Sequence, residues 1–132
     1  MIGIDTNVLV RFLIQDHPDQ SAAATSVISR LTNENPGFIS TVVLAEVSWV
    51  LAVAYKTPRQ NLAALIDGLL RSAQLKVENA PAAYRALAHF KNTDIGDFAD
   101  ALIAEIANLA GAEETVTFDR AAARAFGMRL LG

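Results

Sequence analysis

The sequence contains no cysteine, so neither a disulfide framework nor a thiolate metal site is available to it. It also lacks a long hydrophobic run. The most apolar stretch, residues 42–55, contains an acid and is shorter than the roughly 20 residues that a membrane span needs. The opening residues 1–5 have no basic region, so we expect no secretory signal peptide and a cytoplasmic location.

Positive charge is scarce as well. The chain has 11 lysines and arginines against 14 aspartates and glutamates, which gives a formal net charge of −3. Proteins that hold nucleic acid by charge alone are usually basic, so this balance disfavours that class. It does not exclude a nuclease in which bound metal ions supply the positive charge at the phosphate.

Apolar residues are abundant. They make up 52% of the 132 residues, which excludes disorder. One domain, residues 1–132, can therefore bury a core without disulfide bonds or structural metal ions. This fraction also suggests more apolar surface than a monomer needs, so oligomerisation is plausible.

Short apolar runs alternate with helical patterns along the chain, which is typical of an α/β domain with a parallel sheet. Ser40 or Thr41 is expected to cap one helix, Asn79 another, and Thr57–Gln60 predicts a capping box. We expect strands at 2–4, 38–40, 75–77, 115–118 and 128–131, and helices at 8–14, 18–34, 41–55, 58–72, 81–90, 97–109 and shortly after 119.

The informative residues are acids that interrupt apolar patterns. Glu46 has apolar neighbours on both sides, in a helix with so little polar surface that we expect it to be largely buried. An isolated ionised carboxylate there would be costly, so a cation, a cluster of donors or a shifted pKa must compensate it.

Further acids are expected at one edge of the sheet. Asp5 and Asp119 each follow a predicted strand, where open α/β sheets bind ligands, and Asp97 and Asp100 share one face of a helix. Converging carboxylates would raise one another's pKa, and Mg²⁺ or Mn²⁺, which prefer oxygen ligands, would resolve the repulsion. Such a metal activates water and stabilises charge on a phosphodiester.

Each acid also has a purely structural interpretation. Asp5, Asp97 and Asp119 are each suited to cap the helix that follows them, and Asp100 could complement a helix dipole. Glu46 could be a lone buried acid held by hydrogen bonds. One shared site explains all five more simply than five separate reasons.

Four segments resemble the motifs of PIN domains, in particular VapC-type toxins of prokaryotic toxin–antitoxin modules, and they occur in the family order. Met1–Leu9 resembles the opening motif and Ile39–Glu46 the second. Asp97–Ala104 resembles the third motif and Thr117–Asp119 the fourth. Together they extend the resemblance over essentially the whole chain.

The resemblance implies a three-layer α/β/α sandwich with a central, mainly parallel sheet, usually dimeric, with Mg²⁺- or Mn²⁺-dependent endoribonuclease activity. It assigns the catalytic and metal-binding acids to Asp5, Glu46, Asp100 and the more variable Asp119. Asp97 is a second candidate metal ligand, directly or through water. The family's polar positions beside the metal pocket correspond to Thr6, Asn7 and Thr117.

The resemblance also implies an RNA substrate, with tRNA or rRNA as family-level expectations, and a cognate antitoxin. The basic residues nearest the motifs could contact RNA phosphates, belong to solvated faces or bind the antitoxin. They are Arg11, Lys56, Arg59 and Arg120. The apolar positions of helices 22–31 and 61–70 could form a groove for an antitoxin segment.

Other residues are expected to have no catalytic role. Trp49 and Phe12 are better explained as core or dimer contacts than as platforms for stacking bases. Neither His17 nor His89 is placed like a general base.

Two alternatives to the nuclease remain open. One is a metal-dependent phosphatase or phosphotransferase that uses Asp5 as its nucleophile, although Asn7 stands where a second acid is usual. The other is a catalytically inactive PIN module that only binds partners.

Overall fold

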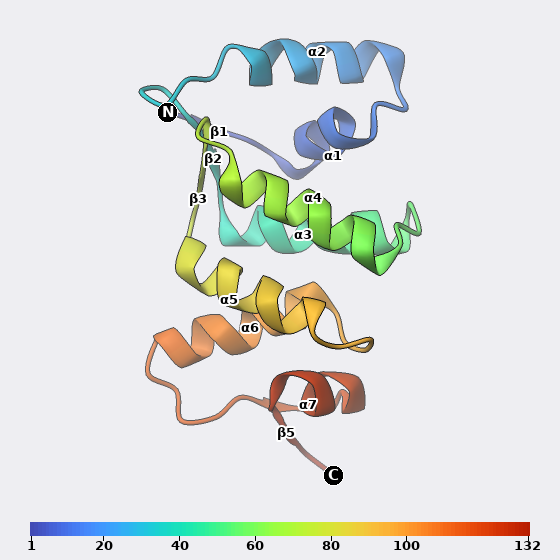
Figure 1. The fold of residues 1–132 in the computed structure, drawn as a ribbon, viewed down its shortest axis with the longest axis vertical. Helices are drawn as coiled ribbons and strands as arrows, with labels where there is room; N and C mark the ends of the chain where they lie inside the picture. Colours follow the sequence, from blue (N-terminus) through green and yellow to red (C-terminus); the bar gives the residue numbers. More distant parts are fainter.

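The computed structural model describes residues 1–132, which form seven helices and five short strands in alternation (Figure 1). The strands are β1 (Ile2–Gly3), β2 (Gly37–Ile39), β3 (Leu75–Val77), β4 (Val116–Thr117) and β5 (Arg129–Leu130). The helices are α1 (Thr6–Ile14), α2 (Pro18–Ser29), α3 (Thr41–Val53), α4 (Arg59–Arg71), α5 (Ala80–Lys91), α6 (Phe98–Leu109) and α7 (Arg120–Phe126).

All strand pairs are parallel, which confirms the predicted α/β sandwich with a parallel sheet. β1, β2 and β3 form one sheet in that order, with Gly3 opposite Phe38 and Phe38 opposite Lys76. The strands β4 and β5 pair separately, with Thr117 opposite Leu130. The strands thus form two sheets, so the ends of β1 and β4 do not share one sheet edge.

The core lies between the helices and the three-stranded sheet. It joins α3 and α4 to α5 and to the start of α6, and Leu44, Leu51, Ile66 and Phe98 are each at most 1% exposed within it. In Figure 1, α1 and α2 lie at one end of the long axis, and α7 and β5 lie at the other. No helix has both the length and the apolar character to cross a membrane.

The second helix ends earlier than predicted, at Ser29 instead of residue 34. The chain then turns, and the Thr32 amide donates to the Asn35 carbonyl. Leu31 is buried, and one of its methyl carbons lies against Gly37 at the start of β2. Burying Leu31 beneath the strand outweighs the helical pattern of the segment.

Helix caps follow the predictions only in part. The Ser40 hydroxyl accepts the Val43 amide at 3.1 Å, as expected for the cap of α3. The capping box predicted at Thr57 is wrong, because Pro58 occupies the cap position of α4 and has no side-chain oxygen to accept a bond. Asn79 stands at the cap position of α5, but its side-chain amide donates to the Thr41 hydroxyl at 3.1 Å.

The prediction that α3 is largely buried is wrong for one of its faces. Val42, Trp49 and Val53 are 68%, 57% and 53% exposed, and Glu46 lies exposed on the same face. Positions 42, 46, 49 and 53 repeat at helical spacing, so these side chains form one stripe. We call it the α3 stripe. Because Glu46 is exposed, its carboxylate is not desolvated. The argument that a buried Glu46 needs a compensating cation or donor cluster therefore does not hold.

Candidate active site

Thr6 links Asp5 to Glu46 through hydrogen bonds to both carboxylates. Asp5 follows buried Ile4 and caps α1, where its Oδ1 accepts the Thr6 amide at 2.8 Å. The Thr6 hydroxyl donates to Oε1 of Glu46 at 2.9 Å. Two exposed carboxylates from the first and second motifs thus flank one threonine.

These residues line an open hollow of about 370 Å³. Asn7 and Arg11 of α1 and Tyr55 after α3 also line it. Nη1 of Arg11 donates to the Tyr55 hydroxyl at 3.1 Å and forms an ion pair of 3.2 Å with Asp16. The hollow therefore combines two acids with one guanidinium that is already oriented by its neighbours.

A second acidic group forms at the start of α6. Burial raises the pKa of Asp100, the negative charges of Asp97 and Asp119 raise it further, and a hydrogen bond with the Asp97 backbone lowers it. Asp97 stands at the cap position of α6 but makes no side-chain capping bond, so its carboxylate remains free. Asp119 caps α7 by accepting the Ala122 amide at 2.9 Å.

Thr117, the polar residue predicted beside this group, orients its loop. Its hydroxyl accepts the Asp119 amide at 3.0 Å. Thr117 therefore shapes the turn from β4 into α7, the turn that presents Asp119.

The predicted convergence of all the acids on one sheet edge is not seen. No three acidic or histidine side chains are arranged to hold a common metal ion. Asp5 follows a strand of the three-stranded sheet, whereas Asp119 follows a strand of the two-stranded one. Instead, Thr6 links Asp5 to Glu46, while the negative charges of Asp97 and Asp119 act on Asp100; we call these the acidic pair and the second acidic group.

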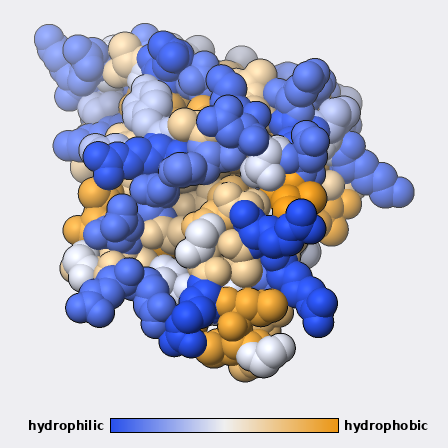
Figure 2. Space-filling model, turned by 60° about the horizontal axis from the view of Figure 1, so that its bottom comes forward, coloured by the Kyte–Doolittle hydropathy of each residue, from blue (hydrophilic) through white to orange (hydrophobic).

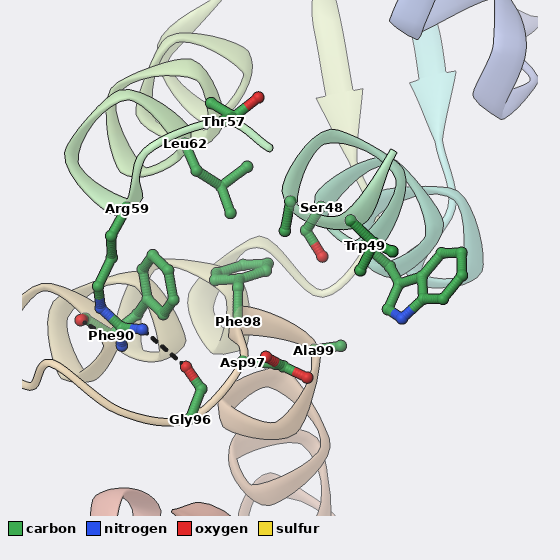
Figure 3. A pocket seen from close by; sticks show the side chains of 12 residues that line it. Ser48, Trp49, Thr57, Arg59, Leu62, Phe90, Gly96, Asp97, Phe98 and Ala99 are labelled. Atoms are coloured by element: carbon green, nitrogen blue, oxygen red, sulfur yellow. Dashed lines mark hydrogen bonds between the residues drawn. The ribbon is translucent and has the colours of Figure 1, made fainter. Parts of the chain in front are cut away.

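Arg59, a predicted contact for RNA or an antitoxin, is held by backbone carbonyls. Its guanidinium is turned inward, where it donates to the carbonyls of Gly96, Phe90 and Ile95 at 2.8, 3.0 and 3.1 Å (Figure 3). Desolvation by burial lowers its pKa, while the charges of Asp94 and Asp97 raise it. Lys56 and Arg120, in contrast, are exposed.

Sequence reasoning missed two features of the site and its surroundings. Tyr55 ends an apolar run, and nothing in the sequence shows that its hydroxyl reaches Arg11. His17 has a structural role, because its Nδ1 accepts the Gln20 amide at the start of α2. The sequence carried one signal for this capping role, because His17 directly precedes Pro18, the first residue of α2.

The structure also shows the surroundings of Trp49, Phe12 and His89. Trp49 is exposed on the α3 stripe, which excludes a core role. Phe12 lines a hollow of about 500 Å³ between α1, α2 and α4, together with Ile28 and Leu65. His89 lies 3.0 Å from Glu105 between α5 and α6.

The donor set fits a hard divalent cation. Both acidic groups offer only carboxylate oxygens, and a cation would offset the charge repulsion at Asp100. Mg²⁺ usually keeps several waters and is held by one or two carboxylates together with substrate phosphates. A pair such as Asp5 and Glu46 is therefore sufficient in number and kind, even without a third acid beside it.

An α/β fold with paired acids in an open hollow is an arrangement that metal-dependent hydrolases use. The family model of the PIN domain matches residues 2–126, nearly the whole chain. The chain therefore belongs to the PIN domain family, which has a metal-dependent nuclease fold. No curated protein matches the sequence significantly.

Proposed function

We propose that the protein is a Mg²⁺- or Mn²⁺-dependent endoribonuclease and the VapC-type toxin of a toxin–antitoxin pair. The observation that supports it most is the pair Asp5 and Glu46, linked through Thr6 in an open hollow beside Arg11. Two adjacent carboxylates exposed to solvent suit a hydrated metal that also binds phosphate.

The catalytic acids in this proposal are Asp5, Glu46, Asp100 and Asp119, with Asp97 as an additional metal ligand. When bound, the metal supplies an activated water and stabilises charge on the phosphodiester. Thr6 orients Glu46, and the capping bond of Asp5 leaves its second oxygen available. Asn7 lines the same hollow and would contact the substrate or a metal-bound water.

RNA is the proposed substrate, and basic residues around the hollow would contact its phosphates. Arg11 lines the hollow itself, while Lys56 and Arg120 are exposed. With a net charge of −3, the protein has little general attraction for RNA. Binding would therefore depend on the metal and on a few local contacts.

The proposed partner is an antitoxin segment that lies in the hollow between α1, α2 and α4. Its lining is mostly apolar and includes Phe12, Ile28, Leu65 and Leu69. An amphipathic helix that places its apolar face into such a groove fits this chemistry. The occupant would cover Phe12, Ile28 and Leu65, which the domain itself leaves half-buried.

A homodimer is proposed on the α3 stripe. Figure 2 shows one face of the molecule, on which hydrophobic side chains reach the surface between hydrophilic ones. Val42, Trp49 and Val53 are exposed along one helix, and Ile103 of the neighbouring α6 is 54% exposed. A second copy of the chain would bury this stripe.

The experiment is cleavage of total cellular RNA by the purified protein, free of antitoxin, with Mg²⁺ or with EDTA. We expect cleavage with Mg²⁺ only, and products with a 5′-phosphate. The Asp5→Asn variant should lose activity, while Asp19→Asn, an exposed acid on α2, should keep it.

The outcomes separate the alternatives. Cleavage in EDTA, or a 2′,3′-cyclic phosphate product, would contradict the metal-dependent mechanism. A folded, metal-binding protein that cuts no RNA would favour the inactive binding module. Hydrolysis of phosphate monoesters without RNA cleavage would favour the phosphatase.

A further inference from the structure

Arg59, the first residue of α4, forms an internal clamp on the segment that joins α5 to α6. Its Nη1 donates to the Gly96 carbonyl, and its Nη2 donates to the carbonyls of Phe90 and Ile95. Its Cζ lies 3.8 Å from the centroid of the Phe90 ring. Figure 3 shows the side chain running beside this ring towards Gly96.

The clamped segment leads directly into the second acidic group. Gly96, whose carbonyl accepts the shortest of these bonds, precedes Asp97, and Asp100 lies one turn further along α6. The segment has no regular structure between the end of α5 and the start of α6. Its conformation therefore depends on contacts made from outside, and Arg59 supplies two of them, to Ile95 and Gly96, besides the bond to Phe90 at the end of α5.

The stack continues into α6. Phe98 is 1% exposed and packs edge-on against Phe90, with ring centroids 6.0 Å apart and an interplanar angle of 86°. The start of α4 is thus connected to the first turn of α6 through the Arg59 guanidinium and the rings of Phe90 and Phe98. A displacement of the Arg59 side chain would therefore shift the backbone that carries Asp97 and Asp100.

The clamp is specific to arginine. A planar guanidinium donates to several carbonyls in fixed directions while its face lies on a ring, whereas a compact ammonium has no planar face and no fixed fork of donors. Nε of Arg59 is buried without a hydrogen-bond partner, which costs free energy. Keeping an arginine at this cost is consistent with its carbonyl contacts being needed.

We propose that Arg59 is a positioning residue, which orders the segment before Asp97 and Asp100 and thereby sets the affinity of these two carboxylates for a divalent cation. This inference rests on the proposed metal-dependent function. Arg59 itself touches neither metal nor RNA.

The test is Mn²⁺ binding, measured by electron paramagnetic resonance, in the wild type and in Arg59→Lys and Arg59→Met. Residues that orient metal ligands typically change affinity by about tenfold or more when replaced. We expect that loss for Arg59→Met and a smaller one for Arg59→Lys. Backbone amide shifts should change at residues 90–101 and remain largely unchanged in α1 and α2.

Arg71→Met is the matched control, because Arg71 lies on the same helix and forms an exposed pair with Asp67. It should bind Mn²⁺ as the wild type does. Wild-type affinity in both Arg59 variants would overturn the inference and leave the proposed function intact. A wild type that does not bind Mn²⁺ would instead contradict the proposed function.

Phe90→Leu provides a second route if the Arg59 variants do not fold. It removes the ring beneath the guanidinium but keeps an apolar core side chain. If the full strength of an ordinary cation–π contact is transmitted to the two acids, the Mn²⁺ affinity falls about two- to fivefold. Wild-type Mn²⁺ affinity in a folded Phe90→Leu variant would then overturn the inference.

Discussion

The hydroxyl of Thr6 donates a 2.9 Å hydrogen bond to Oε1 of Glu46, which lies 40 positions later in the chain. This bond connects the first turn of α1 to the exposed face of α3. It therefore joins the acid of the first motif, whose carboxylate holds the Thr6 amide, to the acid of the second.

Replacing Thr6 by valine should weaken metal binding while leaving the fold intact. Valine keeps the shape of threonine but cannot donate to Glu46, so this carboxylate loses its orientation. We expect Mn²⁺ affinity to fall about tenfold, measured by calorimetry, and RNA cleavage to fall with it. Thr6→Ser keeps the hydroxyl and should bind nearly normally. Equal losses in both variants would argue against the hydrogen bond as the cause.

Asp100→Asn should stabilise the metal-free protein. Burial, followed by the charges of Asp97 and Asp119, raises the pKa of Asp100 in the folded state. The stability linked to this group is therefore fully present below the unfolded pKa and is lost as pH rises through the folded one. Asparagine cannot ionise, so the variant avoids this loss. We expect its free energy of unfolding at neutral pH to be higher by about 0.5 kcal/mol after solvent screening.

Urea denaturation in EDTA at several pH values checks this prediction. The gain should shrink as the pH falls and Asp100 of the wild type becomes protonated. Glu113→Gln removes one exposed negative charge elsewhere and serves as the control. If both variants are equally stabilised, net charge and not the local repulsion is responsible. The Asp100→Asn variant should also lose RNA cleavage.

Gly96→Ala should destabilise the protein. Gly96 has a φ of +82°, and a Cβ there would lie 2.5 Å from Cε2 of Phe126. Strain and contact together should cost about 1–3 kcal/mol, measured by urea denaturation. Gly68→Ala is the control, since a Cβ inside α4 meets open space and should stabilise by about 0.5–1 kcal/mol. A neutral Gly96→Ala would contradict the close packing of α7 against this segment.

Trp49→Lys should disrupt the proposed dimer. Trp49 is 57% exposed on the α3 stripe, so its replacement should change the stability of a monomer little. Loss of a buried aromatic anchor costs about 2 kcal/mol, which corresponds to roughly 30-fold weaker self-association. Sedimentation velocity over a range of concentrations measures this. Leu109→Lys, at the far end of α6, should leave association unchanged, and a monomeric wild type would contradict the dimer.

The order and type of the elements could be predicted well because each depends on local pattern. Alternating apolar runs, Pro18 and Ser40 mark where the elements begin. The end of α2 could not be predicted, because burial of Leu31 against Gly37 is a contact between segments that only the fold brings together.

The candidate site was predictable in its residue types and not in its arrangement. The acids stand out in the sequence as charges within apolar patterns. Which of them lie together depends on contacts between distant segments, such as the hydrogen bond from Thr6 to Glu46, which the sequence pattern does not reveal. Arg59 shows the same limit, since a basic residue near a motif was expected to face a ligand and instead binds backbone carbonyls.

By itself, the sequence determined the family of this protein, a PIN domain in which helices alternate with strands, because motifs and periodicity are properties of neighbouring residues. Only the tertiary structure decided that Thr6 joins Asp5 to Glu46, that the acids form two groups, and that Arg59 turns inward. These relationships depend on packing between segments 30 or more positions apart, where burial and hydrogen-bond satisfaction outweigh local preference.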